Sequence, residues 1–141
     1  MATMKISDLS IGDWVMVEWP DGERWRGRLT RLSVTGGVEV CCANGKHVRC
    51  SDGFISPIPI TAEILEKNGA ARGQRGNFYH YLRLDKNRTL YIHASTNGWR
   101  VEITYDAAGI LRTTHLMPDI NSVHDLQHAM RLAGVDKEIN L

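Results

Sequence analysis

The feature that most constrains the fold is a series of two-residue turn signals in the first 60 residues. They are Asp21-Gly22, Gly36-Gly37, Asn44-Gly45 and Asp52-Gly53. In the short segments between these turns, apolar and polar residues alternate, which is the pattern of β-strands rather than of helices. Strands of this length with no helix between them predict a small, strongly bent antiparallel barrel.

We expect this barrel, of the SH3-like kind, to occupy residues 1–60. The opening I-G-D-W-V resembles the first strand of such barrels. Pro57 and Pro59 cannot lie in a central strand, so they mark a linker or a sheet edge at the end of the first unit. Residues 61–141 are then expected to form a second unit that packs against the barrel.

The second unit reads as helix, four strands and helix. Thr61 is placed to cap a helix that Gly69 ends, and Ser122 is placed to cap a second helix that Gly134 ends. Between the two helices, alternating segments joined by short turns predict a four-stranded antiparallel meander. The predicted fold class is therefore α+β.

Composition and charge exclude several classes of protein. The chain has 141 residues, 43% of them hydrophobic, which is enough to bury a core. A formal net charge of +1 excludes a general polycation, so any nucleic-acid binding requires a local patch. We find no signal-peptide pattern and no apolar run that could span a membrane. Three cysteines, an odd number, favour reduced thiols, which are typical of the cytoplasm. We therefore expect a cytoplasmic protein that does not bind a membrane.

Two histidines, His124 and His128, lie four residues apart in the second predicted helix. Because each helical residue advances about 100°, Leu126 and Met130 fall on one narrow apolar face and both histidines fall nearly opposite. We therefore expect Leu126 and Met130 to be buried against the sheet and the histidines to be exposed. His124→Ala should then cost under about 0.5 kcal/mol, as exposed substitutions do.

The alternative function is a metal-dependent hydrolase that uses the His124/His128 helix together with His93 and His115. A zinc protease requires a glutamate that reaches the metal-bound water, whereas Asp125 is shorter and suits the first turn of a helix. A catalytic zinc also requires a third protein ligand in an enclosed pocket. We therefore expect neither a catalytic residue nor a metal ligand on this helix.

Three cysteines and a histidine lie in one predicted hairpin: Cys41, Cys42, His47 and Cys50. A structural zinc site needs four converging ligands. Neighbouring strand residues point to opposite faces, which separates Cys41 from Cys42, and a two-residue turn at Asn44-Gly45 makes Cys42 face His47. We therefore expect small buried cysteines, no metal site and no cofactor.

Two predicted surfaces combine arginine with aromatic side chains, as nucleic-acid and protein interfaces do. The first follows one strand: Arg24, Arg26, Arg28 and Trp25. The second is the predicted outer face of the meander: Tyr79, Tyr81, Arg83, Tyr91, His93 and Arg100. The simpler interpretations are a solvated strand face paired with glutamates for the first surface and an ordinary outer sheet face for the second.

Two stretches carry a resemblance to a known group of proteins. S-P-I-P-I-T-A-E-I-L-E-K-N-G, residues 56–69, and V-H-D-L-Q-H-A-M-R-L-A-G-V-D-K-E-I, residues 123–139, resemble signature stretches of small proteins from gut Bacteroidales. Those proteins are often associated with prophages or other mobile elements. The resemblance implies an accessory protein of a mobile element and transfers no catalytic residue.

The function expected from these observations is non-enzymatic binding of a macromolecule. We expect a protein partner or self-association first and single-stranded nucleic acid second, because tyrosine and arginine serve both kinds of surface. A purely structural, oligomer-forming protein is a further alternative, beside the hydrolase described above.

Overall fold

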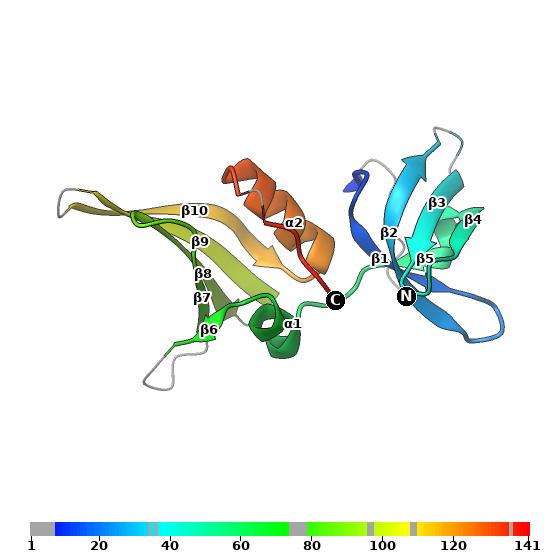
Figure 1. Cartoon of the computed structure of the whole chain (residues 1–141), viewed down its shortest axis with the longest axis horizontal. Coiled ribbons are helices and arrows are strands. Elements are labelled where there is room, and N and C mark those ends of the chain that lie inside the picture. Colours follow the sequence, from blue (N-terminus) through cyan, green and yellow to red (C-terminus); the bar gives the residue numbers. More distant parts are fainter. Residues whose placement is uncertain are drawn as a thin grey trace. The chain divides into compact units, whose positions relative to one another are not determined.

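A computed structural model describes the chain except for residues 1–7, 34, 36, 74–78, 96–97, 108–109 and 136, and gives the backbone alone for the remaining positions between 107 and 119. The chain divides into two compact units, Met1–Pro59 and Ile60–Leu141. Each unit contains a five-stranded antiparallel sheet, and helices are few, so the fold is α+β (Figure 1). No helix in the described part of the chain is both long and apolar enough to cross a membrane.

The first unit is a curled sheet that forms half of a barrel (Figure 1). Its elements are β1 Trp14–Glu18, β2 Arg24–Leu32, β3 Gly37–Cys42, β4 His47–Ser51, the 3₁₀ turn η2 Asp52–Phe54 and β5 Ile55–Ser56. The strand order is β4-β3-β2-β1-β5, so the last strand returns to pair with the first. Val15, Val17, Leu29 and Val40 are buried on the inner side and form half of its core of eight buried residues among those described.

Gly27 allows β2 to pass close to β3 at the bend. A Cβ atom added at Gly27 would lie 2.3 Å from Cγ1 of Val40 and 2.8 Å from the carbonyl oxygen of Cys41. A glycine within a strand is typical of such a close backbone approach. A register shift between Leu29 and Arg31 adds a bulge to the same strand, and bulges increase local twist. Together these two features account for the curl of the sheet.

The hairpin between β3 and β4 differs from the two-residue turn predicted at Asn44-Gly45. The amide of Cys42 donates to the carbonyl of Lys46 at 2.8 Å, which closes a three-residue loop. Gly45 has a φ of 84°, the left-handed conformation that such a loop requires at its last residue. The register therefore moves by one residue, and Cys41, not Cys42, lies opposite His47.

The second unit has a five-stranded meander rather than the predicted four strands. Its elements are α1 Ala62–Lys67, β6 Ala71–Arg72, β7 Tyr79–Arg83, β8 Arg88–Ser95, β9 Gly98–Ala107, β10 Ile110–Ile120 and α2 Val123–Leu132. The order is β10-β9-β8-β7-β6, with every neighbouring pair antiparallel. The additional strand β6 has only two residues, which is too short for an alternating pattern to reveal it in the sequence.

Both helices lie on one face of this sheet (Figure 1). The apolar residues of that face are Leu82, Leu90, Ile92, Val101 and Ile103. Leu126 and Met130 of α2 are 3% and 4% exposed, which confirms their predicted burial. The side chains of Thr61 and Ser122 cap the two helices as predicted, accepting from the amides three residues further on.

The predicted exposure of His124 is wrong, since this residue is only 7% exposed. Arg131, seven residues later, lies within about 20° of it around the helix axis and yet is exposed. Burial along α2 therefore depends on axial position: the first turn is largely covered, whereas Leu132 in the last turn is 76% exposed. A helical wheel shows only the angle around the axis, so it could not predict this burial. Truncating His124 should therefore lower the free energy of unfolding by more than an exposed substitution does.

Candidate functional site

The outer face of the second sheet gathers the aromatic and basic residues predicted for it. Along β7, β8 and β9, residues alternate between the helix-covered face and this outer face. We call this outer surface the tyrosine face and define it by Tyr79, Tyr81, Arg83, Tyr91, His93, Arg100 and Glu102. His115 pairs with Glu102 in the backbone register, but its side chain lies outside the described residues.

The strand register arranges the tyrosine face in rows that run across the strands. One row joins Tyr79, His93 and Arg100 on three neighbouring strands. The next row joins Tyr81, Tyr91 and Glu102. Since alternate residues of a strand are about 7 Å apart, neighbouring rows have that separation. The rings therefore form a compact two-row group rather than isolated side chains.

Neighbouring rings of the tyrosine face contact one another. The ring centroid of Tyr79 lies 5.7 Å from that of His93 and 5.9 Å from that of Tyr91. Tyr81 lies 6.3 Å from Tyr91, and the Tyr91 and His93 rings are stacked with an interplanar angle of 20°. Contacts at these distances favour a shared aromatic surface. Tyr81 is 38% exposed, so part of this surface is open to a ligand.

Gly73 supports the ring at the sheet edge, a role that the sequence pattern did not reveal. A Cβ atom added at Gly73 would lie 2.1 Å from Cζ of Tyr79, so the tyrosine ring lies directly over the glycine. The Gly73 amide also donates to the Tyr79 carbonyl at 2.9 Å. Aromatic rings commonly cover glycine at a sheet edge in this way. The contact extends the aromatic surface to the edge of the sheet and limits where the Tyr79 ring can lie.

The charge of the tyrosine face is positive. Arg83 and Arg100 are exposed and form no ion pair with any described residue. The single carboxylate, Glu102, is mostly covered, and its Oε2 lies 3.5 Å from Nε2 of His93. Two guanidinium groups without a bound counter-charge favour a ligand that carries negative charge.

The surface predicted along one strand of the first unit is divided between the two sides of β2. Arg24, Arg26 and Arg28 share the outer side of the strand, where the Arg28 guanidinium lies 4.8 Å from the ring centroid of Trp14. Trp25 alternates to the inner side and packs against the core, with its ring 6.2 Å from that of Trp19. The tryptophan that accompanies the arginines is therefore Trp14 rather than Trp25.

Among the described histidines of the alternative hydrolase site, His93 does not come together with His124 and His128. His93 lies on the tyrosine face, whereas α2, which carries His124 and His128, covers the opposite face of the sheet. The rings of His124 and His128 are 5.7 Å apart in an edge contact. Within the described residues, no group of three His, Cys, Asp or Glu side chains is placed to hold a metal ion.

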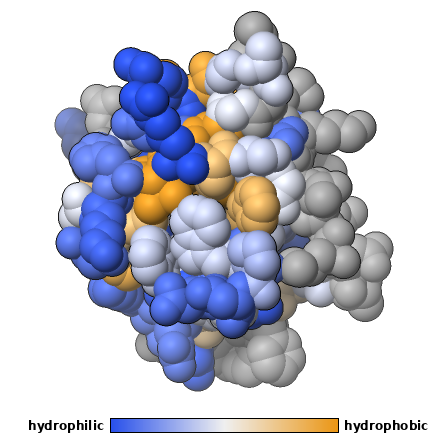
Figure 2. All heavy atoms as spheres, turned by 90° about the vertical axis from the view of Figure 1, so that its right-hand side faces the viewer, coloured by the Kyte–Doolittle hydropathy of each residue, from blue (hydrophilic) through white to orange (hydrophobic). Residues whose placement is uncertain are grey.

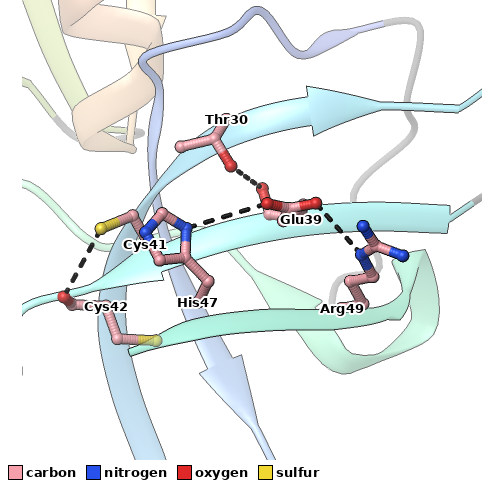
Figure 3. A network of polar contacts seen from close by, with 6 residues as sticks. All are labelled: Thr30, Glu39, Cys41, Cys42, His47 and Arg49. Carbon is pink, nitrogen blue, oxygen red and sulfur yellow. Dashed lines mark hydrogen bonds and ion pairs between the residues drawn. The ribbon is translucent and has the colours of Figure 1, made fainter. Parts of the chain in front are cut away.

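The cysteine hairpin contains a network of polar contacts centred on Glu39 instead of converging thiols (Figure 3). Glu39 accepts from Nε of Arg49 at 3.2 Å, and its other carboxylate oxygen lies 3.8 Å from Nδ1 of His47. Cys42 belongs to the buried core. Burial raises the pKa of its thiol, and the neighbouring Cys41 raises this pKa further by a smaller amount. A thiol with a raised pKa is a poor nucleophile and a poor metal ligand at neutral pH.

The tyrosine face is therefore the candidate site with the most complete geometry. Its side chains come from three consecutive strands of one sheet, and their backbone register is fixed by antiparallel pairing. The outer side of β2 is a second, more strongly basic surface on the other unit. The sequence of the chain matches no protein-family model and no curated protein.

Proposed function

We propose that the protein is a non-enzymatic binding module that holds single-stranded nucleic acid on the tyrosine face. The observation that supports this proposal is the group of contacting rings flanked by Arg83 and Arg100, neither of which has an ion-pair partner among the described residues. Unpaired bases stack on such rings without sequence preference, and arginines at the margin bind backbone phosphates. Single strands are favoured over duplexes because only their bases are free to stack.

Self-association through the same face is the second candidate, because tyrosine and arginine are also enriched at protein interfaces. In a symmetric dimer the same patch meets its own copy. Arg83 and Arg100 would then approach a surface that carries the same two unpaired cations and one covered carboxylate. Like charges at an interface are unfavourable, so the charge of this face favours a polyanion over a second copy.

Replacing Tyr81 or Tyr91 by alanine should weaken oligonucleotide binding by about 1–3 kcal/mol per stacked base. The measurement is fluorescence anisotropy of a labelled oligothymidine, titrated at low salt. Tyr105→Ala is the matched control: Tyr105 is 40% exposed on β9, but it alternates to the opposite face of the sheet. We expect this control to bind as the wild type does.

A different result would favour self-association. No oligonucleotide binding at tens of micromolar protein, together with a dimer in light scattering that Tyr81→Ala dissociates, would contradict the nucleic-acid proposal. Loss of binding in Tyr105→Ala equal to that in Tyr81→Ala would show that the tyrosine face is not the site.

We further infer that the first unit is a small barrel of the SH3-like kind. Support comes from the strand order, in which β5 returns to β1 directly after the 3₁₀ turn η2. We place the protein in the cytoplasm, since its three cysteines are free thiols. As an accessory protein of a mobile element, which the sequence resemblance implies, it would handle single strands exposed during replication or transfer.

A further inference from the structure

The outer side of the first sheet concentrates positive charge that the composition of the whole chain conceals. Strand alternation and pairing bring five arginines to this side: Arg24, Arg26, Arg28, Arg31 and Arg49. The carboxylates among them are Glu18 and Glu39, whereas the whole chain has a net charge of only +1. We call this surface the arginine face. In the sequence Arg31 follows the three alternating arginines, and the bulge in β2 is what returns it to their side of the sheet. Arg49 was missed in the sequence, because only the strand register brings it beside the others.

Two of the five arginines are neutralised within the face. Nε of Arg24 lies 3.1 Å from Oε1 of Glu18, and Nε of Arg49 lies 3.2 Å from Oε2 of Glu39. Arg26 and Arg31 are exposed and have no ion-pair partner in the described part of the chain. These two guanidinium groups are therefore available to an external anion.

A hollow of about 640 Å³ opens at the Arg31 end of the arginine face. Its charged lining residues are Arg31, Arg49 and Glu39, the carboxylate paired with Arg49, and the hydroxyl-bearing residues Ser33, Thr35 and Ser51 line it as well. Guanidinium and hydroxyl groups are the side chains that most often bind phosphate oxygens. Figure 2 shows, on one face of the molecule, strongly hydrophilic residues in deep blue beside a small group of hydrophobic residues in orange.

We propose that the arginine face is a second nucleic-acid contact, which binds backbone phosphates through Arg26 and Arg31. This inference rests on the proposed function, because it assigns to the first unit the same ligand that the tyrosine face stacks. The two faces differ in chemistry: the tyrosine face combines stacking with the phosphate contacts of Arg83 and Arg100, whereas the arginine face adds phosphate contacts alone, and with them salt-dependent attraction. A chain of nearly neutral charge can bind a polyanion in this way.

The test is the salt dependence of oligothymidine binding, measured by fluorescence anisotropy with the full chain. Combining Arg26→Ala with Arg31→Ala should make the slope of log K against log salt shallower by about 1.4, roughly 0.7 for each phosphate that is no longer neutralised. The charge-matched control combines Lys67→Ala with Lys86→Ala, which removes two exposed cations from the second unit. That control should keep the wild-type slope, and Tyr81→Ala should lower affinity at an unchanged slope.

The outcomes separate this inference from the proposed function. A wild-type slope in the double arginine variant, with binding still weakened in Tyr81→Ala, overturns the inference alone. Wild-type binding by Tyr81→Ala, with a shallower slope in the arginine variant, overturns the tyrosine face and retains the arginine face. Absence of any oligonucleotide binding overturns both. Circular dichroism confirms that each variant is folded.

Discussion

We expect Leu126→Ala to lower the free energy of unfolding by about 2–5 kcal/mol, the cost of truncating a large buried side chain. Leu126 is 3% exposed on α2 and borders a cavity of about 20 Å³ together with Leu90 and Ile92 of the sheet. Truncation adds the volume of the removed atoms to this existing space, because the neighbouring strands can relax only partly. The loss of stability therefore includes both the transfer term and a cavity term.

Leu132→Ala is the matched control for this prediction. It removes the same atoms from the same helix at a position that is 76% exposed, so it should cost under about 0.5 kcal/mol. Urea unfolding followed by circular dichroism measures both variants. Equal losses of stability would mean that α2 does not pack on the sheet through the face described here.

We expect Gly27→Ala to destabilise the first unit by about 1–3 kcal/mol, as overpacking of a filled core does. The added Cβ would overlap Cγ1 of Val40, and relief would require β2 and β3 to separate. Gly37→Ala provides the comparison, since Gly37 is also a strand residue of this sheet and its added Cβ would meet only Cβ of Ser33, at 3.8 Å. That variant should be close to neutral in the same urea measurement.

A second observable strengthens the Gly27 prediction. Trp19 and Trp25 pack against the core of the first unit, so their fluorescence reports on its unfolding. The transition should move to lower urea in Gly27→Ala and remain in place in Gly37→Ala. A neutral Gly27→Ala would contradict the close approach of β2 and β3.

Much of the second sheet could be predicted because each of its strands has one apolar and one polar side. Leu90 and Ile92 alternate with Tyr91 and His93, so the sequence alone assigns these residues to opposite faces. The helix caps Thr61 and Ser122 were equally predictable, because capping depends on neighbouring residues only. The membership of the tyrosine face follows from the same alternation.

Other features depend on information that alternation does not contain. The arginine face required the register between β2, β3 and β4, and that register depends on whether the Asn44-Gly45 hairpin has two or three loop residues. The burial of His124 depended on its place along the helix axis rather than around it. The role of Gly73 depended on the ring of Tyr79, which lies across a strand pair.

The return of β5 to β1 has a consequence for the order in which the first unit folds. The pairs Met16–Ser56 and Val17–Ile55 join residues about 40 positions apart, whereas β1 to β4 form successive hairpins. Closing a long loop costs entropy before any contact compensates it, so local hairpins should form first and β5 last. During synthesis, the edge of β1 that pairs with β5 should therefore stay unpaired until residues 55 and 56 leave the ribosome. The shortest strand of the unit thus controls how long that edge is open to pairing with another chain.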